Sequence, residues 1–193
     1  MTLPNFAAVA AGAAQGERHV IRFIRSLSRL TKPLVAAVQG RAVGVGTTML
    51  LHCDLVVLAD NALLSTPFIS LALVPEAASS LLMPLRLGHA RAFELFALGE
   101  PISADVALAF GLVNRVVAQD RLDAEAMTLA QRLAKQPPGS LVATKRLMRN
   151  AEMMLKQMEE EGEYFEARLK SAEAREAFQA FAERRPPDFA NVS

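Results

Sequence analysis

The segment from Lys32 to Glu76 constrains the fold more than any other part of the chain. It contains an unbroken apolar run at 34–38, glycines at 40, 44 and 46, an apolar segment from Thr47, and a further run at 55–59. Short unbroken runs of this kind are typical of strands that are covered on both faces. The order predicts strand, glycine turn, buried helix and parallel strand, which is a βαβ unit with helices over its sheet.

The glycine turn also predicts a place for negative charge. Gly44 and Gly46 permit a sharp turn and let a ligand approach bare backbone. A helix that begins near Gly44 presents unpaired N–H groups at its positive end, which suit a phosphate or a developing oxyanion. Met49 stands where a dinucleotide fingerprint needs its third glycine, and there is no P-loop lysine. A purely structural turn is the alternative.

Composition excludes several classes of protein. The 193 residues suffice for one domain with a substantial core, and a net charge of +1 lacks the basic excess of a nucleic-acid-binding protein. Cys53 is the single cysteine, so no intramolecular disulfide is possible, and we expect a buried, inert thiol. The three histidines lack metal-ligand spacing, so we expect no metal site and a packed His52. With no secretory signal and no membrane-length apolar run, we expect a cytoplasmic protein without a membrane partner.

The rest of the chain is predicted to be mainly helical. Short strands are expected at 62–65 and 113–117, and loops at 1–15 and around Pro75. Apolar periodicity and capping residues predict helices at 17–29, 79–87, 90–98, 104–110, 122–135, 140–169 and 172–183. Ser103 is expected to cap the helix that begins at 104, and the glutamates at 159–161 and 163 are expected on a solvated face.

One motif resembles the signature of the enoyl-CoA hydratase/isomerase (crotonase) family. It reads Lys32-Pro33-Leu34-Val35-Ala36-Ala37-Val38-Gln39-Gly40-Arg41-Ala42-Val43-Gly44-Val45-Gly46 and ends in Cys53-Asp54. The likeness continues through Gly111-Leu112-Val113 to the tail at 180–186. The resemblance implies an α/β fold, a crotonase-like spiral of ββα units that is shortened at its N-terminus. It also implies a core at 1–135 and a helical region at 136–193 for trimerisation and for covering coenzyme A.

The resemblance further implies an acyl-CoA thioester as substrate, with an enolate oxygen held by two backbone N–H groups. One donor would be Val45, flanked by Gly44 and Gly46, which would line the substrate site. The second donor of the family lies in an earlier loop, which is not found in this sequence. We therefore expect either a longer protein or a shortened member with half an oxyanion hole. A non-catalytic subunit that binds acyl-CoA is the alternative.

The carboxylates separate the branches of the family. Hydratases use two glutamates, and Thr48 and Phe68 occupy the matching positions here. Thr66-Pro67-Phe68 followed by Pro75-Glu76 resembles the Δ3,Δ2-enoyl-CoA isomerase branch, which implies Glu76 as the base and a substrate site that includes Thr66 and Phe68. Apolar neighbours would raise the pKa of Glu76. A solvated loop acid, a hydratase and another crotonase reaction are the alternatives.

Two tail residues complete the expected site. Phe181 and Arg184 match positions that in the family reach the adenine or the 3′-phosphate of coenzyme A, often in a neighbouring subunit. An arginine keeps a phosphate partner, although helix packing with an exposed cation is an equal alternative. The resemblance implies a homotrimer or hexamer, no cofactor beyond the coenzyme A of the substrate, and no nucleic-acid partner.

Overall fold

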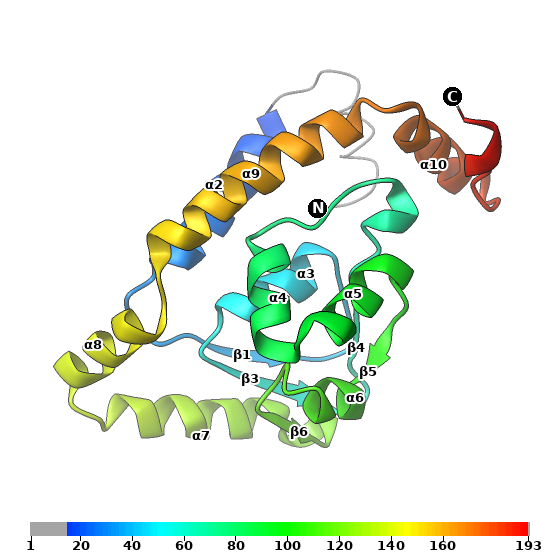
Figure 1. The fold of residues 1–193 in the computed structure, drawn as a ribbon. Helices are drawn as coiled ribbons and strands as arrows, with labels where there is room; N and C mark the ends of the chain where they lie inside the picture. The colour runs from blue at the N-terminus through cyan, green and yellow to red at the C-terminus, as the bar shows by residue number, and fades with distance from the viewer. Residues whose placement is uncertain (1–14, 193) are drawn as a thin grey trace.

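The computed structural model describes residues 15–192, and its repeating unit is two short strands followed by a helix (Figure 1). The first unit consists of β1 (Val35–Val38), β2 (Arg41–Val43) and α3 (Val45–Thr48), which continues as the 3-10 helix η1 (Met49–His52). The second consists of β3 (Leu55–Ala59), β4 (Leu63–Ser65) and α4 (Ser79–Leu87). Strand β2 is a correction, because the sequence predicted only a turn between Val38 and the helix.

Equivalent strands of successive units lie side by side. β1 pairs in parallel with β3, and β3 pairs in parallel with β6 (Arg115–Val117). In the second sheet β2 pairs in parallel with β4, and β4 pairs antiparallel with β5 (Ile102–Ser103). Each of the two ββα units therefore adds one strand to each sheet, which is the expected spiral, and β5 and β6 extend the two sheets beyond these units.

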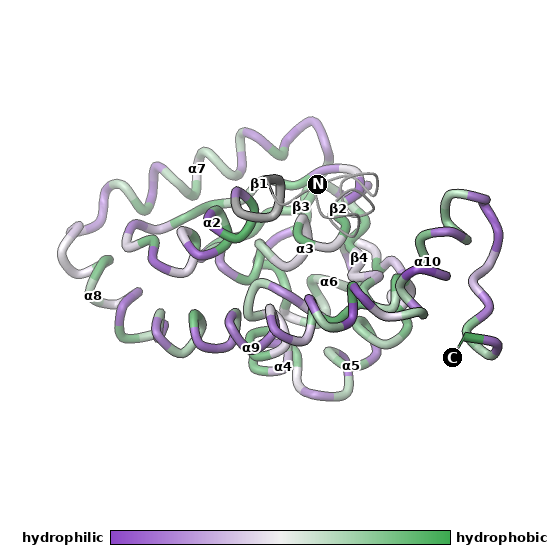
Figure 2. Tube along the Cα trace, turned by 90° about the horizontal axis from the view of Figure 1, so that it is seen from above, coloured by the Kyte–Doolittle hydropathy of each residue, from purple (hydrophilic) through white to green (hydrophobic). Residues whose placement is uncertain are grey.

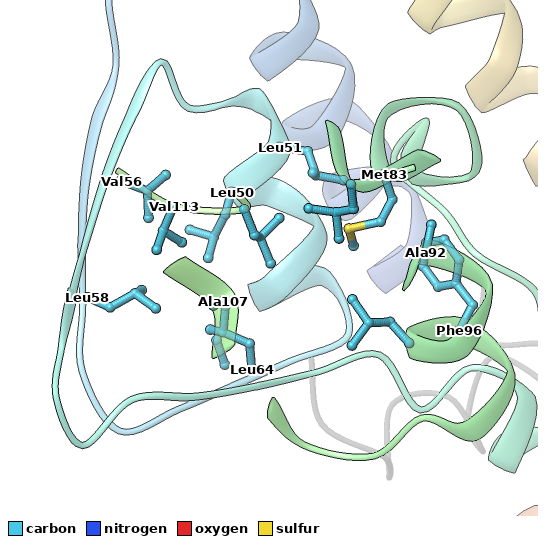
Figure 3. Packing of buried hydrophobic residues seen from close by; sticks show 14 of the residues in the cluster. Leu50, Leu51, Val56, Leu58, Leu64, Met83, Ala92, Phe96, Ala107 and Val113 are labelled. Carbon is cyan, nitrogen blue, oxygen red and sulfur yellow. The ribbon is translucent and has the colours of Figure 1, made fainter. Parts of the chain in front are cut away.

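Both faces of the first sheet are covered, as its unbroken apolar strands predict. On one face Val57 and Ala59 pack against α7 (Leu122–Ala134). On the other face Val56 and Leu58 join the main core, which Figure 3 shows with residues of η1, α4 and α5 (His89–Leu98). Alternate side chains of β3 thus serve two layers, because successive residues of a strand point to opposite faces.

The remaining helices largely follow the predicted pattern. Helix α2 spans Gln15–Arg29, α6 spans Ala104–Ala109 and α10 spans Ala172–Glu183. The Ser103 hydroxyl accepts a hydrogen bond from the Val106 N–H, so Ser103 caps α6 as expected. Three short 3-10 helices complete the elements: η2 (Ile69–Leu71), η3 (Gln119–Arg121) and η4 (Phe189–Asn191). The loop expected at 1–15 falls outside the described residues, except that Gln15 opens α2.

The helix predicted at 140–169 is wrong as a single element. The structure has α8 (Pro138–Met148) and α9 (Ala151–Leu169), which are separated by an extended Arg149. The Asn150 side chain accepts a hydrogen bond from the Met153 N–H and so caps the start of α9. Polar and apolar residues alternate along α7 and α9 in Figure 2, as expected of helices that cover a core with one face.

A buried lysine and a half-buried arginine join these C-terminal helices to the first ββα unit. Lys145 of α8 donates from Nζ to the Lys32 carbonyl at 2.7 Å and to Asp54 Oδ2 at 2.6 Å. Arg149 donates to the His52 carbonyl at 2.7 Å. Helix α9 lies beside α2 and also packs on α4 (Figure 1).

The expected division of the chain into a core at 1–135 and a helical region at 136–193 stays a prediction. Within 15–192, no helix is both long and apolar enough to span a bilayer.

Candidate active site

The glycine turn places an unpaired amide at the start of α3. Gly44 has φ +57 and ψ −118, a backbone conformation that side chains disfavour. Its N–H donates to the Ser65 carbonyl at 2.9 Å, which holds the turn against β4. Val45 is the first helical residue, and within the described residues its N–H donates no hydrogen bond. Gly46 has an ordinary helical backbone, and a Cβ there would meet only Ala42 Cβ, at 3.7 Å.

Glu76 lies against the same short helix. The Thr48 hydroxyl donates to Glu76 Oε1 at 2.6 Å, and the Thr48 side chain is fully buried. Thr48 follows Val45 by three residues, so the two share one side of the helix and are separated by about 4.5 Å along its axis. The structure therefore brings together the two residues that the sequence predicted as catalytic. It does so through Thr48, at the position where a hydratase would carry a glutamate.

The environment of Glu76 changes its acidity. Glu76 is half-buried, and burial raises the pKa of its carboxyl to about 7. The hydrogen bond from Thr48 opposes this shift, and the nearby Glu161 adds to it. A carboxyl with a pKa near neutrality can both take up and release a proton at pH 7, which a solvated loop acid would do poorly.

The loop that carries Glu76 has an unusual backbone. Ala77 and Ala78 have φ values of +63 and +55, in the left-handed region that costs a residue with a side chain about 1–2 kcal/mol. His52 holds one side of this turn, because its Nε2–H donates to the Ala77 carbonyl at 2.7 Å. Arg149 donates to the other ring nitrogen at 3.1 Å, so the ring is neutral and both of its nitrogens are bonded.

Burial confirms two expectations about residues that the site does not use directly. His52 is fully buried, and burial lowers the pKa of its imidazole to about 4, so it is a packed residue. Cys53 is 4% exposed, and burial raises the pKa of its thiol, which keeps it protonated and unreactive. Within 15–192, no group of three His, Cys, Asp or Glu residues could hold a metal ion.

The expected solvated face of α9 is wrong at Glu161. Glu159, Glu160 and Glu163 are exposed, but Glu161 is only 5% exposed. Its Oε2 accepts the Ala78 N–H at 2.6 Å, and its Oε1 accepts the Ser80 N–H at 2.9 Å and the Ser80 hydroxyl at 2.6 Å. A signal was present in the sequence, since position 161 continues a helical stripe of apolar residues: Met154, Met158, Phe165 and Leu169.

Thr66 and Phe68 are part of the core. The Thr66 hydroxyl donates to the Leu95 carbonyl at 2.9 Å, and both residues are buried. The ring of Phe68 packs against Phe96 with 6.2 Å between centroids. These side chains shape the loop before Glu76, and their expected contact with substrate stays a prediction.

Phe181 and Arg184 lie on the surface at the end of α10. Both are exposed, and Arg184 ends the helix with φ +56. Helix α10 packs on η2 and α9, to the right of α3 in Figures 1 and 2. Within the described residues, neither side chain is hydrogen-bonded to Val45 or Glu76, and the expected contact of Phe181 and Arg184 with coenzyme A stays a prediction.

Comparison with known proteins shows similarity along most of the chain. The family model described as enoyl-CoA hydratase/isomerase matches residues 7–192. Enoyl-CoA delta isomerase 2 of Rattus norvegicus is 36% identical over 190 residues, which are 95% of this chain and 49% of that protein. Carnitinyl-CoA dehydratase of Salmonella typhi is 38% identical over 168 residues, which are 82% of this chain and 63% of that protein. The chain thus spans about half to two thirds of the length of these relatives.

A solved structure supports the fold. The crystal structure of an enoyl-CoA hydratase/isomerase from Pseudoalteromonas atlantica T6c superposes with a TM-score of 0.85 at 46% identity, covering 88% of this chain and 69% of that one. This match confirms the crotonase-like spiral that the motif at 32–54 implied. The chain belongs to the enoyl-CoA hydratase/isomerase family.

Proposed function

We propose that this protein acts on an acyl-CoA thioester and shifts a double bond from the 3-position to the 2-position. One observation carries the proposal: a carboxyl with a pKa of about 7, on Glu76, is bonded to the same helical turn that begins with the unpaired Val45 N–H. Proton removal beside a thioester is favoured by a base whose pKa lies near the working pH and by a donor for the enolate oxygen.

The reaction balances with these two groups alone. Glu76 takes the proton from C2, and the electron pair of the broken C–H bond delocalises onto the thioester oxygen. The Val45 N–H donates to that oxygen while it carries negative charge. Glu76 then returns the proton to C4, and the double bond moves from C3–C4 to C2–C3. No electrons leave the substrate, so the step needs no redox cofactor.

Isomerisation fits the carboxylates better than hydration does. Hydration needs one group to activate water and another to deliver a proton, and position 48 carries a hydroxyl instead of a second carboxylate. Glu161 is the carboxylate that influences Glu76, but both of its oxygens already accept hydrogen bonds from the chain. The similarity to carnitinyl-CoA dehydratase makes water elimination or addition the second candidate.

We further propose that coenzyme A is held partly by a second copy of the chain. Phe181 and Arg184 are exposed and lie away from α3, so a trimer or hexamer in which α10 reaches a neighbouring site would use them. Arg184 would pair with a phosphate and Phe181 would stack on the adenine. A water-soluble substrate of this kind suits a cytoplasmic enzyme.

The test compares wild type with Glu76→Gln on a 3-enoyl-CoA, with the conjugated product followed by its ultraviolet absorption. Wild type should form the 2-enoyl-CoA, and Glu76→Gln should lose about a thousandfold in kcat. Glu163→Gln, the same change at an exposed residue of α9, should behave as wild type. Unchanged turnover in Glu76→Gln removes Glu76 from the mechanism. Hydration of a 2-enoyl-CoA without isomerisation supports the second candidate, and binding without turnover indicates a non-catalytic subunit.

A further inference from the structure

Glu161 reaches from α9 into the loop that carries Glu76. It accepts three hydrogen bonds there, two from backbone N–H groups and one from the Ser80 hydroxyl. All three partners donate, so they stabilise the ionised carboxylate. Burial raises the pKa of Glu161, and the bonds from Ser80 and Ala78 oppose that shift. Burying a charged carboxylate costs free energy, and Glu161 is only 5% exposed. Its burial at this loop therefore indicates a function there.

The bonded segment is the left-handed turn at Ala77–Ala78. An alanine pair does not adopt positive φ values without support from its surroundings. Glu161 supplies that support at the Ala78 N–H, and His52 supplies it at the Ala77 carbonyl. His52 and Glu161 lie on either side of the turn directly after Glu76. They therefore fix the position of the Glu76 backbone from which its side chain extends.

The charge of Glu161 also acts on Glu76. Among the described residues, it is the charged group that raises the pKa of the Glu76 carboxyl, after burial itself. The other groups that face this loop have different effects: Thr48 of α3 donates a hydrogen bond, and His52 of η1 is neutral. The Arg168 guanidinium of α9 donates to the Ala72 carbonyl at 3.3 Å, before Glu76 in the same loop. Arg149 lies behind the imidazole and bonds to it.

We propose that Glu161 is the positioning residue for Glu76: its carboxylate holds the left-handed turn in place, and its charge disfavours a second carboxylate beside it. The inference rests on the proposed function of Glu76 as the proton carrier. A proton carrier removes a proton from C2 and later releases it to C4. Between these two steps the Glu76 carboxyl is protonated, and a neighbouring negative charge favours that protonated form.

Two substitutions at Glu161 test its charge and its reach. Glu161→Gln removes the charge and replaces one acceptor oxygen by an NH2 group that cannot accept the Ala78 or Ser80 N–H, so the acid limb of the kcat/KM profile should move about one pH unit lower, and kcat should fall about tenfold. Glu161→Asp keeps the charge but cannot reach the turn, so the limb should stay near its wild-type pH while kcat falls at least as far. Neither the acid limb of the kcat/KM profile nor kcat should change in Glu163→Gln. An unmoved acid limb in Glu161→Gln, or wild-type kcat in both variants, overturns the proposal.

A second measurement does not depend on turnover. The pKa of Glu76 can be read by NMR of its labelled carboxyl carbon, assigned by the loss of its signal in Glu76→Gln, and it should be about one unit lower in Glu161→Gln than in wild type. If wild type does not isomerise 3-enoyl-CoA, the proposed function fails, whereas this shift still supports the effect of Glu161 on the Glu76 carboxyl. Equal pKa values in the two proteins overturn the inference.

If Glu161→Gln does not fold, Ser80→Ala offers a second variant, because it removes one donor to the same carboxylate. A fall in kcat of about threefold supports the proposal, and wild-type kcat overturns it.

Discussion

Replacing Glu76 by glutamine should stabilise the fold above neutral pH while it removes activity. The folded-state pKa of Glu76 is raised from 4.5 to about 7, so the folded protein binds this proton more tightly than the unfolded chain does. Stability therefore falls as the pH rises from about 4.5 through 7 and stays lower above that. At 1.36 kcal/mol per pKa unit the full shift corresponds to about 3 kcal/mol, and because Glu76 is only half-buried we expect about 1–2 kcal/mol.

The assay is urea unfolding of both proteins at about pH 5 and about pH 8, with the free energies of unfolding compared at each pH. Glutamine keeps an oxygen that can accept the Thr48 hydroxyl, so packing changes little. The variant should match wild type at the lower pH and exceed it at the higher. Glu163→Gln should show no pH-dependent difference. Equal differences between variant and wild type at both pH values would refute the assignment of a raised pKa to Glu76.

Three further predictions concern the groups around this carboxyl. Val45→Pro removes the N–H while leaving a residue that suits the first position of a helix, so kcat should fall about a hundredfold or more with an unchanged circular dichroism spectrum. Thr48→Val removes the donor to Glu76, so the pKa of Glu76 should rise further and the acid limb of kcat/KM should move to higher pH in a pH–rate profile. Arg184→Ala should raise KM for a CoA ester, but not for a pantetheine thioester that lacks the nucleotide, with kcat unchanged in both steady-state assays.

The residues of the first ββα unit predicted much of the fold. Unbroken apolar runs at 34–38 and 55–59 predicted β1 and β3 because strands covered on both faces need no polar alternation. The role of Ser103 followed from the preference of serine for helix caps, and the helix at 79–87 followed from apolar periodicity. Both signals act within one or two helical turns. Glu76 and Val45 could be proposed from the motif, although their proximity depends on a hydrogen bond between residues 28 positions apart.

Features that depend on tertiary contacts could not be predicted in the same way. Strand β2 has three residues and exists because β4 pairs with it. The break between α8 and α9 is held by Arg149, whose side chain bonds to His52 about a hundred residues earlier. The position of Glu161 was predicted wrongly because a run of acidic residues normally faces solvent, and its burial follows from hydrogen bonds with Ala78 and Ser80.

The turn after Glu76 is held by His52, which comes earlier in the chain, and by Glu161, which comes much later. A polypeptide emerging from the ribosome can complete the spiral of strands well before residue 161 has been synthesised. We therefore expect proton transfer by Glu76 to require docking of α9, and chains that end before residue 161 to be inactive toward thioesters.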